Sequence, residues 1–294
     1  MIPILLALVA ALIFALATVL QQRVAMTASD RQARSPLFLL RLARNPVWLA
    51  GIVLVWIGYG FHVAALSGGQ LVVVQPILAM TMVFALPIGA RLSAQRIDGR
   101  DLLAALLAAA GLAAFLLVSE PVGGVDEPSA GAWLAWGGGS AAAAAALVWA
   151  ARGRRPNRRA ALAGTAAGIL FGLHGALTKG LAERLHEGIG PLLGSWVVWA
   201  ALLVALLSMA VSQIALQAGD LAPAIATESV VDPVVSVLLG VGLFAETIHG
   251  SAAGNAASLA ALAAMLAGVG ALSVRTSGRW RRSPLPTLEE WQSS

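Results

Sequence analysis

The chain has 294 residues, of which 59% are hydrophobic and only 11% are charged, whereas a soluble domain carries about 25% charged residues. It contains no cysteine, which excludes disulfides, thiolate metal sites and cysteine nucleophiles. The net charge of +5 comes from arginines that cluster between apolar runs. That pattern indicates membrane orientation rather than a nucleic-acid groove.

Nine apolar runs are long enough, or nearly so, to cross a bilayer as helices. The first begins without basic residues and ends without a small-residue cleavage site, so we interpret it as a membrane span rather than a signal peptide. The expected fold is an all-α, polytopic membrane protein of nine transmembrane helices. The predicted spans are 2–22, 47–66, 70–90, 101–119, 132–151, 160–180, 191–213, 220–245 and 252–274.

Basic residues are distributed unevenly over the segments that join these spans. Of the 19 lysine and arginine residues, only Lys179 and Arg184 fall on one side of a nine-span bundle, and the rest collect on the other. The positive-inside rule places the arginine-rich side in the cytoplasm, so we expect the N-terminus outside and the C-terminus inside. The expected location is the cell (inner) membrane, as a multi-pass protein.

Two segments outside the spans have patterns of their own. Residues 35–44 begin with Ser35 and Pro36 and continue with leucines and arginines. They indicate either a short amphipathic helix on the inner leaflet or an ordinary basic loop. Residues 276–294 are rich in Arg, Ser, Pro and Glu, and we expect them to form a disordered cytoplasmic tail.

An internal repeat relates the two halves of the chain. Residues 65–71 match residues 215–221 at Ala, Leu, Gly and Leu, and both segments join adjacent spans. Spans one to four therefore correspond to spans six to nine, and a shift of five crossings inverts the second copy. Inverted-topology repeats are a common construction of secondary transporters. The predicted domains are a first repeat at 1–120 and span five plus the second repeat at 121–275.

Each repeat consists of a short turn, a proline-containing span, a short loop and a small-residue span. The second repeat also contains Asp220-Leu221-Ala222-Pro223, Asp232-Pro233 and Leu243-Phe244-Ala245-Glu246. With these features the chain resembles the EamA-type repeat of the drug/metabolite transporter superfamily over nearly its whole length. The first repeat matches less well, because Arg91-Leu92-Ser93 replaces the family's frequent Gly-Glu. Most members have ten spans, and a nine-span chain with an external N-terminus resembles the NIPA-type magnesium transporters.

An acidic pair, Glu228 and Asp232, lies in a stretch of the eighth span that is otherwise uncharged. Residues four apart share one face of a helix, and carboxylates within a bilayer are costly and usually functional. Pro233 follows directly and deprives the carbonyl of Ser229 of its helical donor. We expect these groups to bind a substrate or a coupling ion. The alternative is that Asp232 only supports a kink at the proline.

Other polar residues within spans are weaker candidates for the same site. Tyr59, His62 and Gln75, from spans two and three, are predicted to line the pathway. His174 is either a packed, hydrogen-bonded histidine or a proton relay. For Lys179 we favour an extended side chain that reaches the outer surface over one that reaches inward to a carboxylate. Glycines at every fourth position, Gly164, Gly168 and Gly172, are predicted to permit close helix packing.

The expected function is that of a secondary transporter that moves a metabolite or a drug by alternating access, with proton exchange on Glu228 and Asp232. A NIPA-like carrier of magnesium or another divalent cation is the first alternative, and a non-transporting membrane scaffold is the second. We expect no enzymatic activity, because the chain has no HExxH or GxSxG motif. No cofactor or resident metal is expected. The expected partners are a small-molecule or ion substrate and the lipid bilayer, but not nucleic acid, and a homodimer stays an open alternative.

Overall fold

The computed structural model describes residues 1–26, 44–92, 97–121, 124–125, 127–185, 188–218, 221–249 and 251–280. Within these ranges, nine helical segments are long and apolar enough to cross a membrane, which confirms the predicted all-helical, multi-pass membrane protein. Of the predicted amphipathic segment at 35–44, residues 35–43 lie outside the described residues and Arg44 lies within them. Residues 281–294 of the predicted tail also lie outside them.

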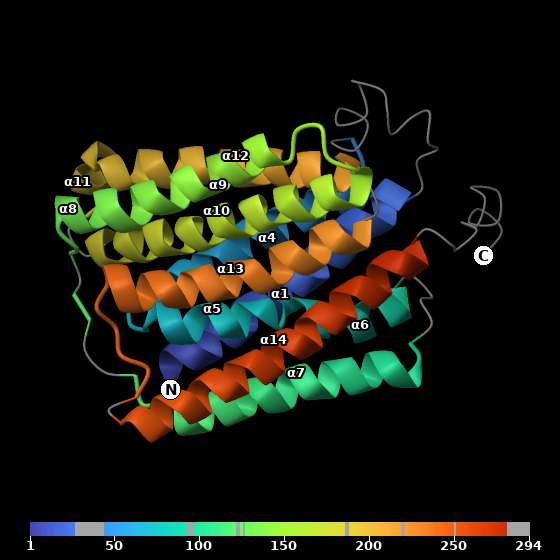
Figure 1. Ribbon diagram of the computed structural model, residues 1–294, viewed down its shortest axis with the longest axis horizontal. Coiled ribbons are helices and arrows are strands. Elements are labelled where there is room, and N and C mark those ends of the chain that lie inside the picture. The colour runs from blue at the N-terminus through green and yellow to red at the C-terminus, as the bar shows by residue number, and fades with distance from the viewer. Residues whose placement is uncertain are drawn as a thin grey trace.

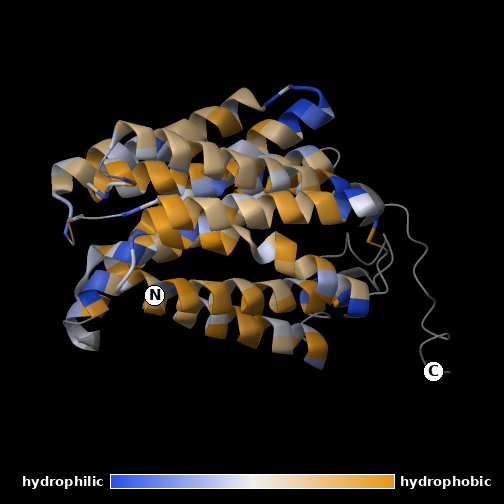
Figure 2. Cartoon of the chain, turned by 90° about the horizontal axis from the view of Figure 1, so that it is seen from below, coloured by the Kyte–Doolittle hydropathy of each residue, from blue (hydrophilic) through white to orange (hydrophobic). Residues whose placement is uncertain are grey.

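Successive spans run in opposite directions along one bundle, so that α1 begins at one end and α14 finishes at the other (Figure 1). Hydrophobic residues cover the middle of the bundle and polar residues collect toward its two ends (Figure 2). In chain order the helices are α1 (Ile2–Met26), α4 (Pro46–Leu66), α5 (Leu71–Ala79), α6 (Thr81–Leu92), α7 (Gly99–Val118), α8 (Ala130–Ala132), the π-helical η1 (Trp133–Gly138), α9 (Gly139–Ala150), α10 (Pro156–Arg184), α11 (Ile189–Gly194), α12 (Trp196–Ala218), α13 (Leu221–Leu243) and α14 (Ala252–Trp280).

Local sequence signals fix several helix ends. The side chain of Asn45 accepts hydrogen bonds from the amides of Val47 and Trp48, and Pro46 occupies the first turn of α4. Asp98 caps α7 in the same way and forms a capping box with Asp101. These caps satisfy amides that the helix itself leaves without partners.

The seventh span begins later than predicted. Residues from Ile189 to Gly194 form the separate short helix α11, and Ser195 is extended between it and α12. The membrane helix therefore starts at Trp196 rather than at residue 191. The apolar pattern gave no sign of this break, because α11 is itself apolar. At the C-terminal end, α14 continues to Trp280, five residues into the predicted tail.

Two spans are not continuous α-helices. The third consists of α5 and α6, which meet at Met80, whose amide donates to the carbonyl of Ile77 at 3.0 Å. The fifth consists of α8, η1 and α9. A π-helical stretch inside an α-helix is rare and is frequently found at functional sites.

The most buried span in the described chain is α10, which packs against α13, α12 and α9. Its glycines lie directly on α13. A Cβ atom at Gly168 would lie 2.9 Å from the carbonyl oxygen of Glu228, and one at Gly172 would lie 2.9 Å from the Cβ of Val235. The predicted role of this glycine stripe in close packing is confirmed.

Candidate substrate and ion site

The two acids of α13 are each held by a hydroxyl group. Ser212 of α12 donates to Glu228 at 2.7 Å, and Ser236, one turn beyond Asp232, donates to Asp232 at 3.3 Å. Both carboxylates are half-buried, as is Ser229 between them. The described residues place no lysine, arginine or histidine nitrogen within 4.0 Å of either acid. The pair therefore has neutral partners only.

Pro233 does not interrupt the helix that carries the acids. α13 is continuous from Leu221 to Leu243, with the proline inside it. Because proline has no N–H group, the carbonyl of Ser229 lacks its helical donor, as the sequence predicts. Ser229 directly follows Glu228 and lies three residues before Asp232, so this carbonyl adds an oxygen that could bind a cation or a polar group.

Tyr59 and His174 bring α4 and α10 together. Their rings stack with centroids 5.9 Å apart and an angle of 17° between planes. The Tyr59 hydroxyl forms a hydrogen bond of 3.2 Å with the hydroxyl of Thr178. His62 lies edge-on to Tyr59 at 6.0 Å. The predicted pathway residues of α4 are thus in one cluster with the histidine of α10.

The two histidines of this cluster differ in their partners. His174 Nδ1 lies 3.2 Å from the carbonyl oxygen of Ala201 on α12, so this histidine is packed and hydrogen-bonded. A role as a proton relay stays a prediction. His62 is 5% exposed, and its buried Nε2 atom has no hydrogen-bond partner among the residues that the structure describes. Such an atom costs free energy unless a ligand or another group binds it.

Gln75 connects α5 to the acid-bearing helix. Its side chain is buried against Gly175 of α10, where a Cβ atom would overlap the Gln75 amide and lie 3.5 Å from the Ser236 hydroxyl. Ser236 in turn donates to Asp232. At Gly175, therefore, Gln75 of the first half of the chain comes close to Ser236 of α13.

The predicted site residues form two groups on neighbouring positions of α10. One group joins Gln75 to Asp232 through Ser236 and Gly175, and the other contains Tyr59, His62 and His174. Glu228 lies one turn from Asp232, toward the beginning of α13, and bonds to α12 instead. All seven candidates therefore lie on four helices that contact one another, namely α4, α5, α10 and α13, and Ser229 can contribute its backbone carbonyl.

The prediction for Lys179 is wrong. Its side chain is buried, and its Nζ atom lies 3.1 Å from Glu183, 3.5 Å from Glu246 and 3.2 Å from the carbonyl oxygen of Gly69. The ammonium ion has three acceptors within the protein and no need to reach the surface. It points to a carboxylate, but not to the pair on α13.

Glu246 is a functional candidate that the sequence showed only as the end of the motif Leu243-Phe244-Ala245-Glu246. It is 1% exposed and accepts hydrogen bonds from the amides of Leu71 and Val72, at 2.8 and 2.9 Å. Burial raises the pKa of its carboxyl above the ordinary value, and these two amides and Lys179 oppose that rise. The available signal was a lone glutamate directly after an apolar run, in a chain with a single lysine.

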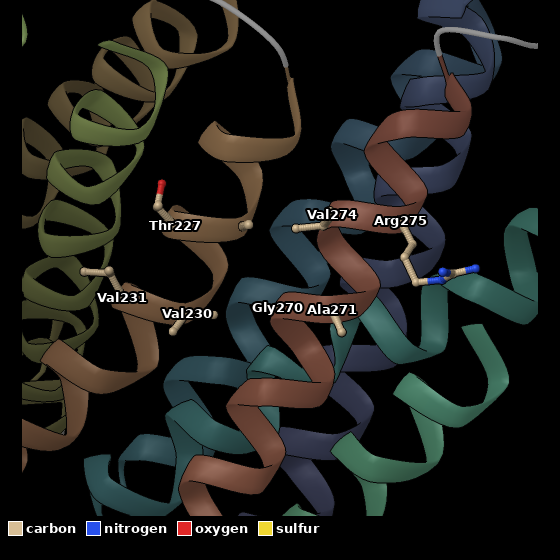
Figure 3. A pocket seen from close by; sticks show the side chains of 8 residues that line it. Thr227, Val230, Val231, Gly270, Ala271, Val274 and Arg275 are labelled. Carbon is tan, nitrogen blue, oxygen red and sulfur yellow. The ribbon is translucent and has the colours of Figure 1, made fainter. Parts of the chain in front are cut away.

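A cavity of about 590 Å³ lies between α13 and α14, and Figure 3 shows the side chains around it. The acids are not among them. Val230 and Asp232 are two positions apart, and two residues on a helix turn through about 200°. The cavity therefore lies on the face of α13 away from the acids. Its lining residues are Ala226, Thr227, Val230, Val231, Gly270, Ala271, Val274 and Arg275.

Around the acid pair of α13, the potential metal ligands are oxygen atoms. Within the described residues, no three His, Cys, Asp or Glu side chains come close enough together to hold a metal ion. The pair on α13 could supply two carboxylates, and Ser212 and Ser236 could supply hydroxyl oxygens. Such a set suits a proton or a transient cation.

Comparison with known proteins gives a relative without a described role. No protein-family model matches the chain, and no solved structure matches it. An uncharacterized protein of Corynebacterium glutamicum is 29% identical over 255 residues, which cover 84% of this chain and 86% of that protein. The likeness therefore extends over most of both sequences.

Proposed function

We propose that this protein is a secondary transporter that moves a small solute, with proton exchange at Glu228 and Asp232. One observation carries the proposal. Two half-buried carboxylates stand one turn apart in a membrane-spanning helix, and their partners are two serine hydroxyls rather than cations. Two ionised carboxylates in that setting are costly. A bound proton or a bound cationic ligand lowers that cost. If the proton and the ligand replace each other at the pair, the transport of one is coupled to the transport of the other.

The helix packing supports an EamA-like arrangement. α4 packs against α1 in the first half, and α12 packs against α10 in the second. α5 and α6 also pack against α1, as α13 packs against α10. These pairs correspond to one another when the first repeat is aligned with the second at the offset of 150 residues that relates residues 65–71 to residues 215–221. In such transporters the substrate site lies near the bilayer midplane, between the two repeats. In this chain we assign that position to the place where Gln75 meets Gly175 and Ser236.

The proposed orientation places the arginine-rich end in the cytoplasm and the N-terminus outside. At one end of the bundle, Arg275 forms ion pairs with Asp98 and Asp101, and at the other, Arg184 pairs with Glu127. The arginine-rich loops join spans at the end of the bundle that contains Arg275, Asp98 and Asp101. The rule that basic loops stay in the cytoplasm gives the direction.

A carrier of magnesium or another divalent cation is the second candidate. The oxygen-only ligand set favours it, because magnesium prefers carboxylate oxygens and retains several waters. Two carboxylates on one helix would bind such an ion through part of its coordination shell. The nine-span resemblance points the same way.

Flux measurements in proteoliposomes separate these functions. We expect a pH gradient to drive uptake of at least one compound from a panel of labelled amino acids, nucleosides and organic cations. Asp232→Asn and Glu228→Gln should each lower that flux at least about tenfold, since removal of a coupling group acts on every cycle. Glu127→Gln, at an exposed glutamate far from the pair, is the matched control.

Three outcomes assign the function. Unchanged pH-dependent flux in Asp232→Asn would exclude proton coupling at this pair. Magnesium uptake that follows the same two variants would favour the divalent-cation carrier. No flux of magnesium or of any compound, with correctly folded protein, would favour a scaffold.

A further inference from the structure

A second cavity, of about 550 Å³, lies on the side of the bundle away from α14 (Figure 1). It is enclosed by α8, η1, α10 and α12, and its flanking residues Leu134 and Trp196 are 78% and 50% exposed. It therefore opens sideways, toward the surroundings of the bundle.

The length of this groove matches one leaflet of a bilayer. Along α10 it extends from Arg184, at the end of the helix, to Leu173. Eleven residues at about 1.5 Å each give a depth of roughly 16 Å. Half of a hydrocarbon core of about 30 Å is about 15 Å. On α12 the residues Trp196, Ala200 and Val204, four apart, line the same depth on one face.

Polarity in the groove is confined to its outer end. Arg184 is the one charged residue that lines it in the described part of the chain, and all the deeper lining residues are apolar. The guanidinium donates to the Ser195 hydroxyl at 2.8 Å and lies 3.4 Å from the carboxylate of Glu127, which is 60% exposed. Five N–H donors leave some free for a further acceptor. Trp133 and Trp196 meet edge to face just below, as suits the membrane–water interface.

The π-helical stretch provides the space. Gly137, within η1, faces the groove, where a Cβ atom would meet only Trp133 at 3.4 Å and Leu173 at 3.7 Å. A larger side chain there would enter the cavity. The unusual winding and the glycine thus keep the groove open at its inner end.

We propose that this groove binds one phospholipid, with an acyl chain along Leu173, Leu177 and Leu134 and the phosphate on Arg184. Cavity length, lateral opening and a single cation at the interface fit a lipid better than a soluble anion. A phosphate pairs with arginine through short, charge-assisted hydrogen bonds. The site shares no residue with the acid pair of α13, so the proposal does not depend on the transport function.

Native mass spectrometry of purified protein with added phosphatidylglycerol tests this site. The wild type should retain one tightly bound lipid under conditions that strip the others. Arg184→Gln should lower the retained fraction about tenfold, and Ala200→Phe, which fills the groove, should lower it by a similar factor. Arg154→Gln, at an exposed arginine of the opposite end, should retain the lipid as the wild type does.

Two results would overturn the proposal. One is equal retention in the wild type and the variants, which would mean that the lipid binds elsewhere on the surface. The other is full competition by sn-glycerol 3-phosphate, which has the phosphate but no chain and would show a site for soluble anions. If Ala200→Phe does not fold, Gly137→Leu fills the same space from η1.

Discussion

The carboxylate of Glu246 accepts a hydrogen bond of 2.8 Å from the amide of Leu71, 175 residues earlier in the chain. It thereby caps the first turn of α5 from a segment that follows α13. A helix N-terminus attracts negative charge, and the second oxygen of the carboxylate accepts from Val72. The link fastens the proline-containing span of the first half to the corresponding span of the second.

Replacement of Glu246 by alanine should destabilise the protein by at least about 3 kcal/mol. The change leaves two buried amides without an acceptor and removes one of the two carboxylates beside Lys179, and such losses cost about 1–3 kcal/mol each. Unfolding in a titration with sodium dodecyl sulfate measures the effect. Glu127→Ala removes an exposed glutamate and should change stability by less than about 0.5 kcal/mol. Equal stability of the two variants would contradict a capping role for Glu246.

Acid should weaken the cap of α7 through Asp98. The pKa of this carboxyl lies below its ordinary value of 3.8, first because the backbone of Asp101 donates to it and also because Arg275 does. A lowered pKa means that the ionised form stabilises the folded state. The stabilisation by ionised Asp98 is complete above the ordinary pKa of 3.8. It disappears as the pH falls through the lower pKa that this carboxyl has in the folded protein.

Thermal unfolding of the wild type and Asp98→Ala between pH 6 and pH 3 measures this effect, given that the titration of one group extends over about two pH units. The difference in unfolding temperature between the wild type and Asp98→Ala should be constant in the upper part of this pH range and should shrink toward pH 3. Asp98→Asn keeps a capping oxygen without a titrating group, so its difference from Asp98→Ala should not change with pH. A wild-type difference that grows in acid would refute the prediction.

Larger residues at Gly168 should disrupt the contact between α10 and α13. A Cβ atom there would lie 2.9 Å from both the Glu228 carbonyl oxygen and the Val231 Cβ, so Gly168→Leu must separate the helices. Overpacking of this kind costs about 1–3 kcal/mol. The matched control is Gly60→Ala in α4, where no atom lies within 4 Å of the new Cβ, and it should stabilise slightly. Detergent-induced unfolding reports both, and a tolerated leucine would mean that the two helices are not packed this closely.

His62→Leu should stabilise the fold while it impairs transport. The buried Nε2 atom has no partner within the described part of the chain. An unsatisfied polar atom costs about 1–3 kcal/mol, so its removal should raise stability by about 1 kcal/mol. If the atom serves a substrate, the same change should lower flux about tenfold. Val53→Leu, at an exposed position of the same helix, should alter neither quantity. A loss of stability together with flux would show a purely structural histidine.

The spans were predictable because apolar length is a property of each segment by itself. The same holds for the bond between Ser236 and Asp232, which follows from their spacing of four on one helix. The partner of Glu228 was not predictable, because Ser212 lies on another helix and only packing brings it close. Contacts between helices need relative rotations that the sequence pattern does not determine.

Lys179 shows this limit most clearly. Its neighbour Glu183 lies one turn away, but Gly69 and Glu246 come from segments 110 residues before and 67 residues after it. Without them, an extended side chain that reaches the surface is the reasonable expectation for a lysine near the end of a span. The break before Trp196 was missed for a related reason, because a short apolar helix and the start of a span have the same composition.

The burial of Lys179 has a practical consequence. It is the one lysine of the sequence, and its buried side chain is shielded from amine-directed reagents in the folded protein. Modification of Lys179 itself requires its end of the bundle to open and Glu246 to withdraw. The rate at which an acylating reagent modifies this residue therefore reports that opening directly, without an added fluorophore or an engineered cysteine.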